Sequence, residues 1–300
     1  MATLYTHQSE NVTKTYLLMG VFLMVVVAIG WAISLYMGNP FILYIAVGFA
    51  LLMNVGSYWF SDKLVISMTG AHPTELKDNP ELYRIVENLS ITAGLPIPKI
   101  YIIEDPSPNA FATGRDPKHA VVAVTTGLLA ILDKTELEGV IAHELSHVGN
   151  RDMLVMTVAV VLAGFVAIVA DMFLRASMFG GGRDNDSKLG PIVIVMAIAG
   201  SILAPIAAQL IKLAISRKRE YLADASGALL TRYPEGLASA LSKIAKAGIP
   251  MQKQSNATAH LFIADPTGGE SKRGIGARIG GLFATHPPVE DRIRLLREGK

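Results

Sequence analysis

Two long uncharged stretches lie near the start of the chain. Residues 16–36 read YLLMGVFLMVVVAIGWAISLY, and residues 41–60 form a second uncharged stretch after a short turn. About 20 consecutive apolar residues is the length of a helix that crosses a bilayer. A cleaved signal peptide is the alternative for the first stretch, but its apolar core is only about 7–15 residues long. We therefore predict a transmembrane hairpin over residues 16–60, after a polar N-terminal segment at residues 1–15 that we expect in the cytoplasm.

A second pair of apolar stretches lies in the middle of the chain. Residues 153–174 and 191–215 are apolar, and a glycine-rich, charged loop joins them. Their lengths predict a second membrane hairpin over residues 153–215. A soluble helical hairpin is the alternative, because hydropathy alone does not distinguish a membrane helix from a buried one. With both hairpins, the chain has about four transmembrane helices.

The chain between the two hairpins, residues 61–152, has the mixed pattern of a soluble domain. Pro80 and Gly94 are start and stop signals for a helix over residues 79–93. Three short runs rich in β-branched and aromatic residues follow, with Pro, Gly and Asp between them. They predict strands at residues 99–103, 109–113 and 120–125.

A second soluble region follows the second hairpin, over residues 216–300. Apolar periodicity predicts helices at residues 216–231 and 233–247 and a short terminal helix at residues 289–298, whose Arg and Glu residues we expect to be solvated. A glycine-rich loop at residues 268–281 lacks the spacing of a phosphate-binding loop. The fold class is therefore mostly α, an α+β membrane protein with a small β-sheet.

Composition and charge narrow the function classes. The chain has 300 residues, of which 17% are charged, and its mean hydropathy of +0.40 is too high for a typical soluble protein. The net charge is only +2, so electrostatics favour no nucleic-acid partner. The chain has no cysteine, which excludes disulfides and thiolate ligands. Any metal must be held by His, Asp or Glu.

The distribution of basic residues predicts an orientation. With four crossings, most of the Lys and Arg residues near the span ends lie on one side of the membrane, namely Lys14, Lys63, Arg151, Lys212, Arg217, Lys218 and Arg219. The positive-inside rule places this side in the cytoplasm. Both termini and the soluble regions are then expected to face the cytoplasm.

The stretch TELEGVIAHELSHVGN carries the clearest chemical signal. His143 and His147 are four residues apart, so a helix presents both imidazoles on one side, where one zinc ion can bind both. Glu144 lies beside them and can take a proton from the water that the metal activates. Thr135 and Glu138 predict a capping box at the helix start. The alternative is a polar helix face with two solvated histidines.

A catalytic zinc needs a third protein ligand. Glu220 is the candidate, and Asp224 lies one helical turn later on the same face. Glu220 can bind the metal while Asp224 orients a histidine, as carboxylates commonly do for metal-binding imidazoles. A surface pair of carboxylates is the alternative.

The predicted strand at residues 109–113 is a candidate for substrate binding. An extended peptide can pair with an exposed sheet edge, and Asn109, Ala110, Phe111 and Ala112 form such a candidate edge. An ordinary hairpin strand is the alternative.

Four motifs in order carry a resemblance to a known family. They are NAFATG at residues 109–114, HELSH at 143–147, EYLAD at 220–224 and THPP at 285–288. Together with the order of membrane hairpins, they resemble the HtpX-type membrane zinc metalloproteases, which are relatives of the prenyl-protein (CAAX) endoproteases. The resemblance covers nearly the whole chain and implies a zincin-like catalytic domain.

The resemblance also implies the roles of individual residues. It implies that His143, His147 and Glu220 bind one zinc ion per chain, that Glu144 is the general base, and that the Asn109 segment lines the substrate cleft. It places His286 near the zinc, where its imidazole can donate a hydrogen bond to the tetrahedral oxyanion. The alternative for His286 is a residue that only caps the terminal helix.

Our hypothesis from the sequence is a zinc metalloendopeptidase of the bacterial inner membrane. The resemblance implies quality control of misfolded or damaged membrane proteins, which belongs to the stress response. Expected partners are membrane-protein or unfolded polypeptide substrates and the lipid bilayer. Two rivals are a CAAX-type protease for prenylated substrates and a zinc-stabilised scaffold without hydrolysis. Glu144 argues against the scaffold, because a structural zinc site needs no general base.

Overall fold

The computed structural model describes residues 4–179, 216–252, 258–266 and 287–299. It divides into two compact units. One, called here the sheet unit, comprises residues 1–12, 61–157 and 215–300, and the other, called the helical unit, comprises residues 13–60 and 158–214.

A four-stranded mixed sheet lies at the centre of the sheet unit. Its order is β1 (His72–Pro73), β2 (Lys99–Ile103), β4 (Val121–Thr125) and β3 (Ala110–Thr113). β2 and β4 are parallel, whereas β1 and β3 pair antiparallel with their neighbours. The three strands predicted from the sequence are confirmed within a residue. β1 has only two residues, too few for a periodic pattern.

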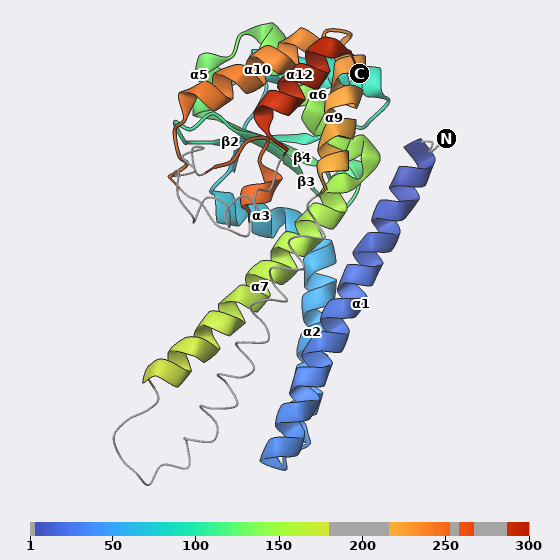
Figure 1. Cartoon of the computed structure of the whole chain (residues 1–300), viewed down its shortest axis with the longest axis vertical. Helices are drawn as coiled ribbons and strands as arrows, with labels where there is room; N and C mark the ends of the chain where they lie inside the picture. Colours follow the sequence, from blue (N-terminus) through green and yellow to red (C-terminus); the bar gives the residue numbers. More distant parts are fainter. Residues whose placement is uncertain (1–3, 180–215, 253–257, 267–286, 300) are drawn as a thin grey trace. The chain divides into compact units, whose positions relative to one another are not determined.

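Helices pack against this sheet to form the core. Among the described residues, the helices that lie wholly within the sheet unit are α3 (Ser61–Thr69), α4 (Pro80–Ala93), α5 (Thr126–Ile131), α6 (Lys134–Asn150), α9 (Arg217–Thr231), α10 (Pro234–Ala247) and α12 (Val289–Glu298). Figure 1 shows α6, α9, α10 and α12 gathered on one side of the sheet. Apolar residues of α4, α6, α10 and the strands form one buried cluster. α6 thus lies between the sheet and the other helices.

The helix ends follow local signals in the sequence. Pro80 begins α4, and Gly94 ends it in the left-handed conformation, with φ of 66°. The predicted cap of α6 is wrong by two residues. Asp133, not Thr135, caps the helix, and its carboxylate accepts a hydrogen bond from the N–H of Glu136, whose side chain bonds back to Asp133 N. Asp is a stronger N-cap than Thr, which explains the earlier start.

Two glycines allow α6 and α10 to approach closely. A Cβ atom at Gly139 would lie 2.6 Å from the backbone nitrogen of Leu237 and 2.8 Å from its Cα. A Cβ atom at Gly236 would lie 2.7 Å from the carbonyl oxygen of Thr135. Such distances are below van der Waals contact, so the backbones of the two helices meet directly here.

The helical unit contains the apolar stretches. α1 (Leu4–Met37) and α7 (Asp152–Phe179) have residues in both units, and α2 (Phe41–Trp59) lies within the helical unit. Among the described residues, two helices are long and apolar enough to cross a membrane, Ser9–Met37 and Phe41–Trp59. α6 and the first part of α7 meet the same criteria only when they are taken together, as one span that is bent by 85° between Asn150 and Asp152. They would then form a third candidate span. The fourth predicted span, residues 191–215, lies outside the described residues.

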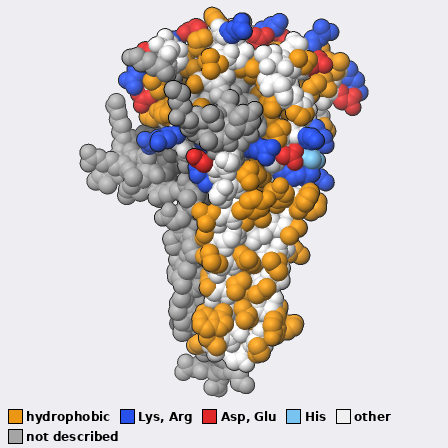
Figure 2. Space-filling view, turned by 90° about the vertical axis from the view of Figure 1, so that its right-hand side faces the viewer, with side chains coloured by type: hydrophobic (Ala, Val, Ile, Leu, Met, Phe, Trp, Pro, Cys, Tyr) orange, Lys and Arg blue, Asp and Glu red, His pale blue; other side chains and the backbone are white. Residues whose placement is uncertain are grey.

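The surface of α1 and α2 within the helical unit is largely apolar. Large side chains of α1 and α2 are exposed, among them Trp31 at 56%, Tyr44 at 69% and Leu52 at 69%. Figure 2 shows hydrophobic side chains covering these helices, whereas Lys, Arg, Asp and Glu gather on the sheet unit. An exposed apolar surface of this extent indicates contact with lipid. The predicted first membrane hairpin is thus present as two helices.

We expect Gly139→Ala to destabilise the protein by about 1–3 kcal/mol, because the added methyl group meets backbone atoms of α10 that cannot move aside. Thermal unfolding in detergent, followed by circular dichroism, measures the change. Gly149→Ala in the same helix is the matched control, because among the described residues its Cβ would meet the Leu95 side chain at an ordinary contact distance of 3.7 Å. An equal loss of stability in both variants would contradict this account of the α6–α10 contact.

Candidate metal centre

Two buried histidines on α6 face the same side of the helix. His143 is 1% exposed and His147 is 5% exposed. Their Nε2 atoms lie 3.2 Å apart, and their rings meet edge to face. The i, i+4 spacing therefore brings the two imidazoles together as the sequence predicts.

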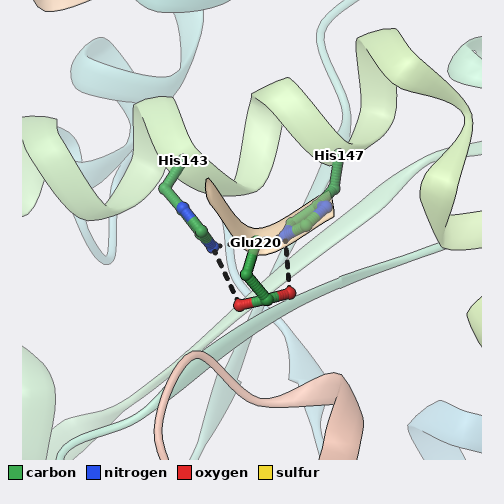
Figure 3. Close-up of side chains that lie close together, drawn as sticks. All are labelled: His143, His147 and Glu220. Carbon is green, nitrogen blue, oxygen red and sulfur yellow. Dashed lines mark hydrogen bonds and ion pairs between the residues drawn. The ribbon is translucent and has the colours of Figure 1, made fainter. Parts of the chain in front are cut away.

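Glu220 on α9 completes a cluster of three. Its two carboxylate oxygens lie 4.0 Å from His143 Nε2 and 3.6 Å from His147 Nε2 (Figure 3). α9 comes this close to α6 because of Gly227, where a Cβ atom would lie 2.9 Å from the backbone nitrogen of His143. The predicted pairing of Glu220 with the two histidines is thus present.

The cluster fits a single metal ion. One ligand atom from each of the three residues lies within 4.8 Å of the others. Two ligands about 2.1 Å from a tetrahedral zinc are about 3.4 Å apart, close to the distances found here. Two histidines and one glutamate are also the ligands of zinc peptidases, which leave one position open. The residues therefore fit a catalytic metal.

Glu144 lies beside the cluster without belonging to it. Its side chain is 1% exposed, and burial raises the pKa of its carboxyl group to about 7. The backbone of Ala112 in β3 acts in the opposite direction and lowers this pKa. A carboxyl group whose pKa is near neutral can both take and return a proton, which is what a general base and acid requires.

Each histidine contacts a further carboxylate through its outer ring nitrogen. His143 Nδ1 lies 2.9 Å from Asp224 Oδ1, and the orienting role of Asp224 stays a prediction. His147 Nδ1 lies 3.3 Å from Asp152 Oδ2, a contact that the sequence did not reveal. Burial alone would lower the pKa of His147, but Asp152 and Glu220 raise it to about 9. The carboxylates of Asp152 and Glu220 thus favour a positive charge at His147.

Asp152 has a further partner from the start of the chain. The side-chain amide of Asn11 in α1 donates hydrogen bonds to Asp152 Oδ1, at 2.5 Å, and to the carbonyl oxygen of Asn150, at 3.1 Å. Arg219 Nε lies 4.0 Å from the same carboxylate oxygen. Since all of these residues belong to the sheet unit, the first turns of α1 help to hold the orientation of His147.

Arg292 on α12 connects the carboxylates of α9. The side chain is 2% exposed, and its Nε and Nη2 atoms donate to the two oxygens of Asp224 at 2.8 and 2.7 Å. Its Nη1 atom lies 3.7 Å from Glu220 Oε2. Burial alone would raise the pKa of Asp224, but the guanidinium of Arg292 lowers it to about 2. Asp224 is therefore ionised and holds His143.

The expectation of a solvated terminal helix is wrong for Arg292. A signal was present in the sequence, because Val289, Arg292, Ile293 and Leu296 occupy one face of α12 at helical spacing. Leu296 is buried and Val289 and Ile293 pack against the core. A charged residue within such an apolar stripe must be paired when it is buried.

The other predicted site residues have different outcomes. β3 is the last strand of the sheet order, but Asn109, Ala110, Phe111 and Ala112 are at most 5% exposed and do not form an open edge. The substrate-binding role of these residues stays a prediction. His286 lies outside the described residues.

Comparison with known proteins identifies the family. The sequence profile of peptidase family M48 matches residues 76–300. The chain belongs to peptidase family M48. A protease HtpX homolog from Tropheryma whipplei (strain Twist) is 48% identical over 298 residues, which cover 98% of each chain. A protease HtpX homolog from Pyrococcus furiosus is 49% identical over 288 residues, covering 95% of this chain and 94% of the relative.

A solved structure has a similar fold. The crystal structure of S. mikatae Ste24p matches with a TM-score of 0.50 and 19% identity. The match covers 98% of this chain and 66% of that chain. At this identity the likeness concerns the fold alone. The full-length relatives make this an HtpX-type member of family M48, and the resemblance inferred from the sequence is confirmed.

We expect Asp152→Asn to weaken metal binding about 10–100-fold, because the carboxylate that orients His147 is lost. Zinc affinity, measured by competition with a chelating dye, tests this. Asp291→Asn is the control, because Asp291 pairs with the exposed Arg294 on α12. Equal affinities in the Asp152 variant and the wild type would show that Asp152 does not support the site.

Proposed function

We propose that this M48 protein is a membrane-embedded zinc endopeptidase in which His143, His147 and Glu220 bind the metal. The observation that carries the proposal is the buried cluster of these three side chains beside a fourth, Glu144, which is not needed as a ligand. Family membership supports a metallopeptidase, and the donor set supports zinc.

The residues around the cluster have separate roles in peptide hydrolysis. When bound, zinc supplies Lewis-acid chemistry that acidifies water and polarises the substrate carbonyl. Glu144 takes the proton of the attacking water and returns it to the amine that leaves. Asp224 and Asp152 hold the imidazoles of His143 and His147 in position. Burial excludes bulk water, which strengthens these electrostatic interactions.

The membrane arrangement is part of the proposal. We infer four transmembrane helices, of which α1 and α2 have the length and apolar surface that a span requires. The basic residues near the span ends support a cytoplasmic sheet unit with both termini on the same side. The membrane is the plasma membrane, which is the inner membrane if the source is a bacterium with two membranes.

The proposed substrates are misfolded or damaged membrane proteins and unfolded polypeptides, cleaved as part of protein quality control. An active site on a chain that also carries membrane helices can act on polypeptides that emerge from the lipid. Two alternatives remain from the sequence, a prenyl-substrate endoprotease and a zinc scaffold. Cleavage of a polypeptide without a prenyl group argues against the first, and any metal-dependent hydrolysis argues against the second.

Glu144→Gln tests the general base. We expect it to lower the rate of peptide hydrolysis about 10²–10⁴-fold while zinc stays bound, because the amide keeps the shape of the carboxylate but takes no proton. Cleavage of an unfolded polypeptide by detergent-purified protein, with the metal removed and restored, measures the effect.

The wild-type protein and Glu235→Gln are the controls, because Glu235 forms an exposed ion pair with Arg297 on the surface. Hydrolysis that survives in Glu144→Gln, or that does not depend on the metal, would refute the proposed mechanism. Zinc binding without cleavage of any polypeptide would favour the scaffold.

His286→Ala tests the role that the family resemblance implies for this residue. If His286 donates to the oxyanion, kcat falls about 10²–10³-fold and zinc affinity is unchanged. His72→Ala is the control, because His72 is exposed and contacts only Glu104 among the described ion pairs. A kcat equal to that of the control variant would leave His286 as a residue that only caps α12.

A further inference from the structure

The outer edge of β3 is already bound by another part of the same chain. After the short 3₁₀ helix Ala259–Leu261, residues 262–264 run antiparallel to β3, and we call them the internal strand. The N–H of Ile263 donates to the carbonyl oxygen of Ala110 at 2.9 Å, and Phe262 lies opposite Phe111. The internal strand thus occupies the edge that β4 leaves unpaired.

Asn109 extends this pairing with its side chain. The N–H of Ala264 donates to Asn109 Oδ1 at 3.2 Å, and Asn109 Nδ2 donates to the carbonyl oxygen of Ala264 at 3.0 Å. The amide therefore binds the backbone of the internal strand in the way that a further strand residue would. Such contacts depend on backbone atoms only, so any extended polypeptide can make them.

The internal strand is held firmly and is buried. Phe262 is 1% exposed and Ile263 is 2% exposed. The rings of Phe262 and Phe111 meet edge to face, with centroids 5.2 Å apart. The pairing with β3 nevertheless involves few residues, because it forms an isolated bridge rather than a ladder. Another extended chain that replaces this segment therefore has few backbone hydrogen bonds to β3 to re-form, but it must also cover the apolar surface that Phe262 and Ile263 now bury.

The same edge leads directly to the metal centre. The N–H of Ile263 donates to the carbonyl oxygen of Ala110 on the outer side of β3, and the backbone of Ala112, two residues further along, interacts with the carboxylate of Glu144. Arg292 Nη1 donates to the carbonyl oxygen of Ile263 at 3.1 Å and lies 3.7 Å from Glu220 Oε2. One guanidinium thus contacts both the internal strand and a residue of the metal cluster.

We propose that the internal strand occupies the substrate-binding edge as a built-in competitor, and that a polypeptide substrate binds by displacing it. The substrate takes over the hydrogen bonds of Ile263 and Ala264, so Arg292 becomes a positioning residue for a substrate carbonyl group. Proline is excluded from the substrate position that replaces Ile263, because Ala110 needs an N–H donor there. This inference rests on the proposed endopeptidase function.

The first test weakens the competitor without changing the residues that bind substrate. Ile263→Pro removes the N–H that bonds to Ala110, whereas Ile263→Ala removes a similar part of the side chain and keeps the N–H. For hydrolysis of an unfolded polypeptide by the full-length protein, KM of Ile263→Pro should be about two- to tenfold below that of Ile263→Ala, the range for the loss of one hydrogen bond. An equal or higher KM in the proline variant would overturn the proposal.

The second test follows displacement directly and does not need hydrolysis. The chain has no cysteine, so Ile263→Cys in the Glu144→Gln background carries a single thiol. A maleimide should label it slowly in the zinc-loaded protein and several-fold faster with a saturating cysteine-free polypeptide such as β-casein. Val122→Cys on the central strand β4, which is 0% exposed, is the matched control and should stay slow.

The outcomes distinguish a failure of the displacement proposal from a failure of the proposed endopeptidase function. If the wild type cleaves β-casein and the Glu144→Gln protein binds it, but labelling at position 263 stays unchanged, displacement is wrong and the endopeptidase stands. If labelling of Val122→Cys rises equally, the sheet opens as a whole and displacement is again wrong. If β-casein is neither bound nor cleaved in the presence of zinc, the endopeptidase and the competitor both fail.

Discussion

Arg292 sits away from water between two carboxylates, and the arrangement of the metal centre depends on this charge balance. A buried guanidinium is stable only where negative groups surround it, and Asp224 and Glu220 provide them. The same contact keeps Asp224 ionised, so that it can hold His143. α12, at the end of the chain, is therefore needed to orient a histidine near its middle.

Local features of the site were predictable because they depend on spacing along one helix or strand. The i, i+4 pair on α6, the helix starts at Pro80 and Pro234 and the strand at residues 99–103 follow from periodicity and turn residues. Glu220 required more, since its place beside the histidines depends on how α9 packs. The resemblance of motifs supplied that step, and Gly227 explains it physically.

Contacts between distant segments were not predictable from the pattern. Asp152 and Asn11 are far apart in the sequence, and nothing local marks either as a partner of the other. The cap of α6 is a local feature and was misplaced for another reason, because Asp133 and Thr135 both suit an N-cap and Asp133 is the stronger of the two. The internal strand has no alternating pattern of its own, since its place is determined by β3 and Arg292.

The connection between α6 and α7 consists of a single residue, Arg151, in the left-handed conformation with φ of 58°. The next residue, Asp152, already orients His147 from the first turn of α7. One inserted residue would rotate the start of α7 by about 100° and turn this carboxylate away from the imidazole. The number of residues in this junction is therefore as strictly constrained as the identity of the metal ligands. Natural insertions or engineered fusions in this protein must fall elsewhere.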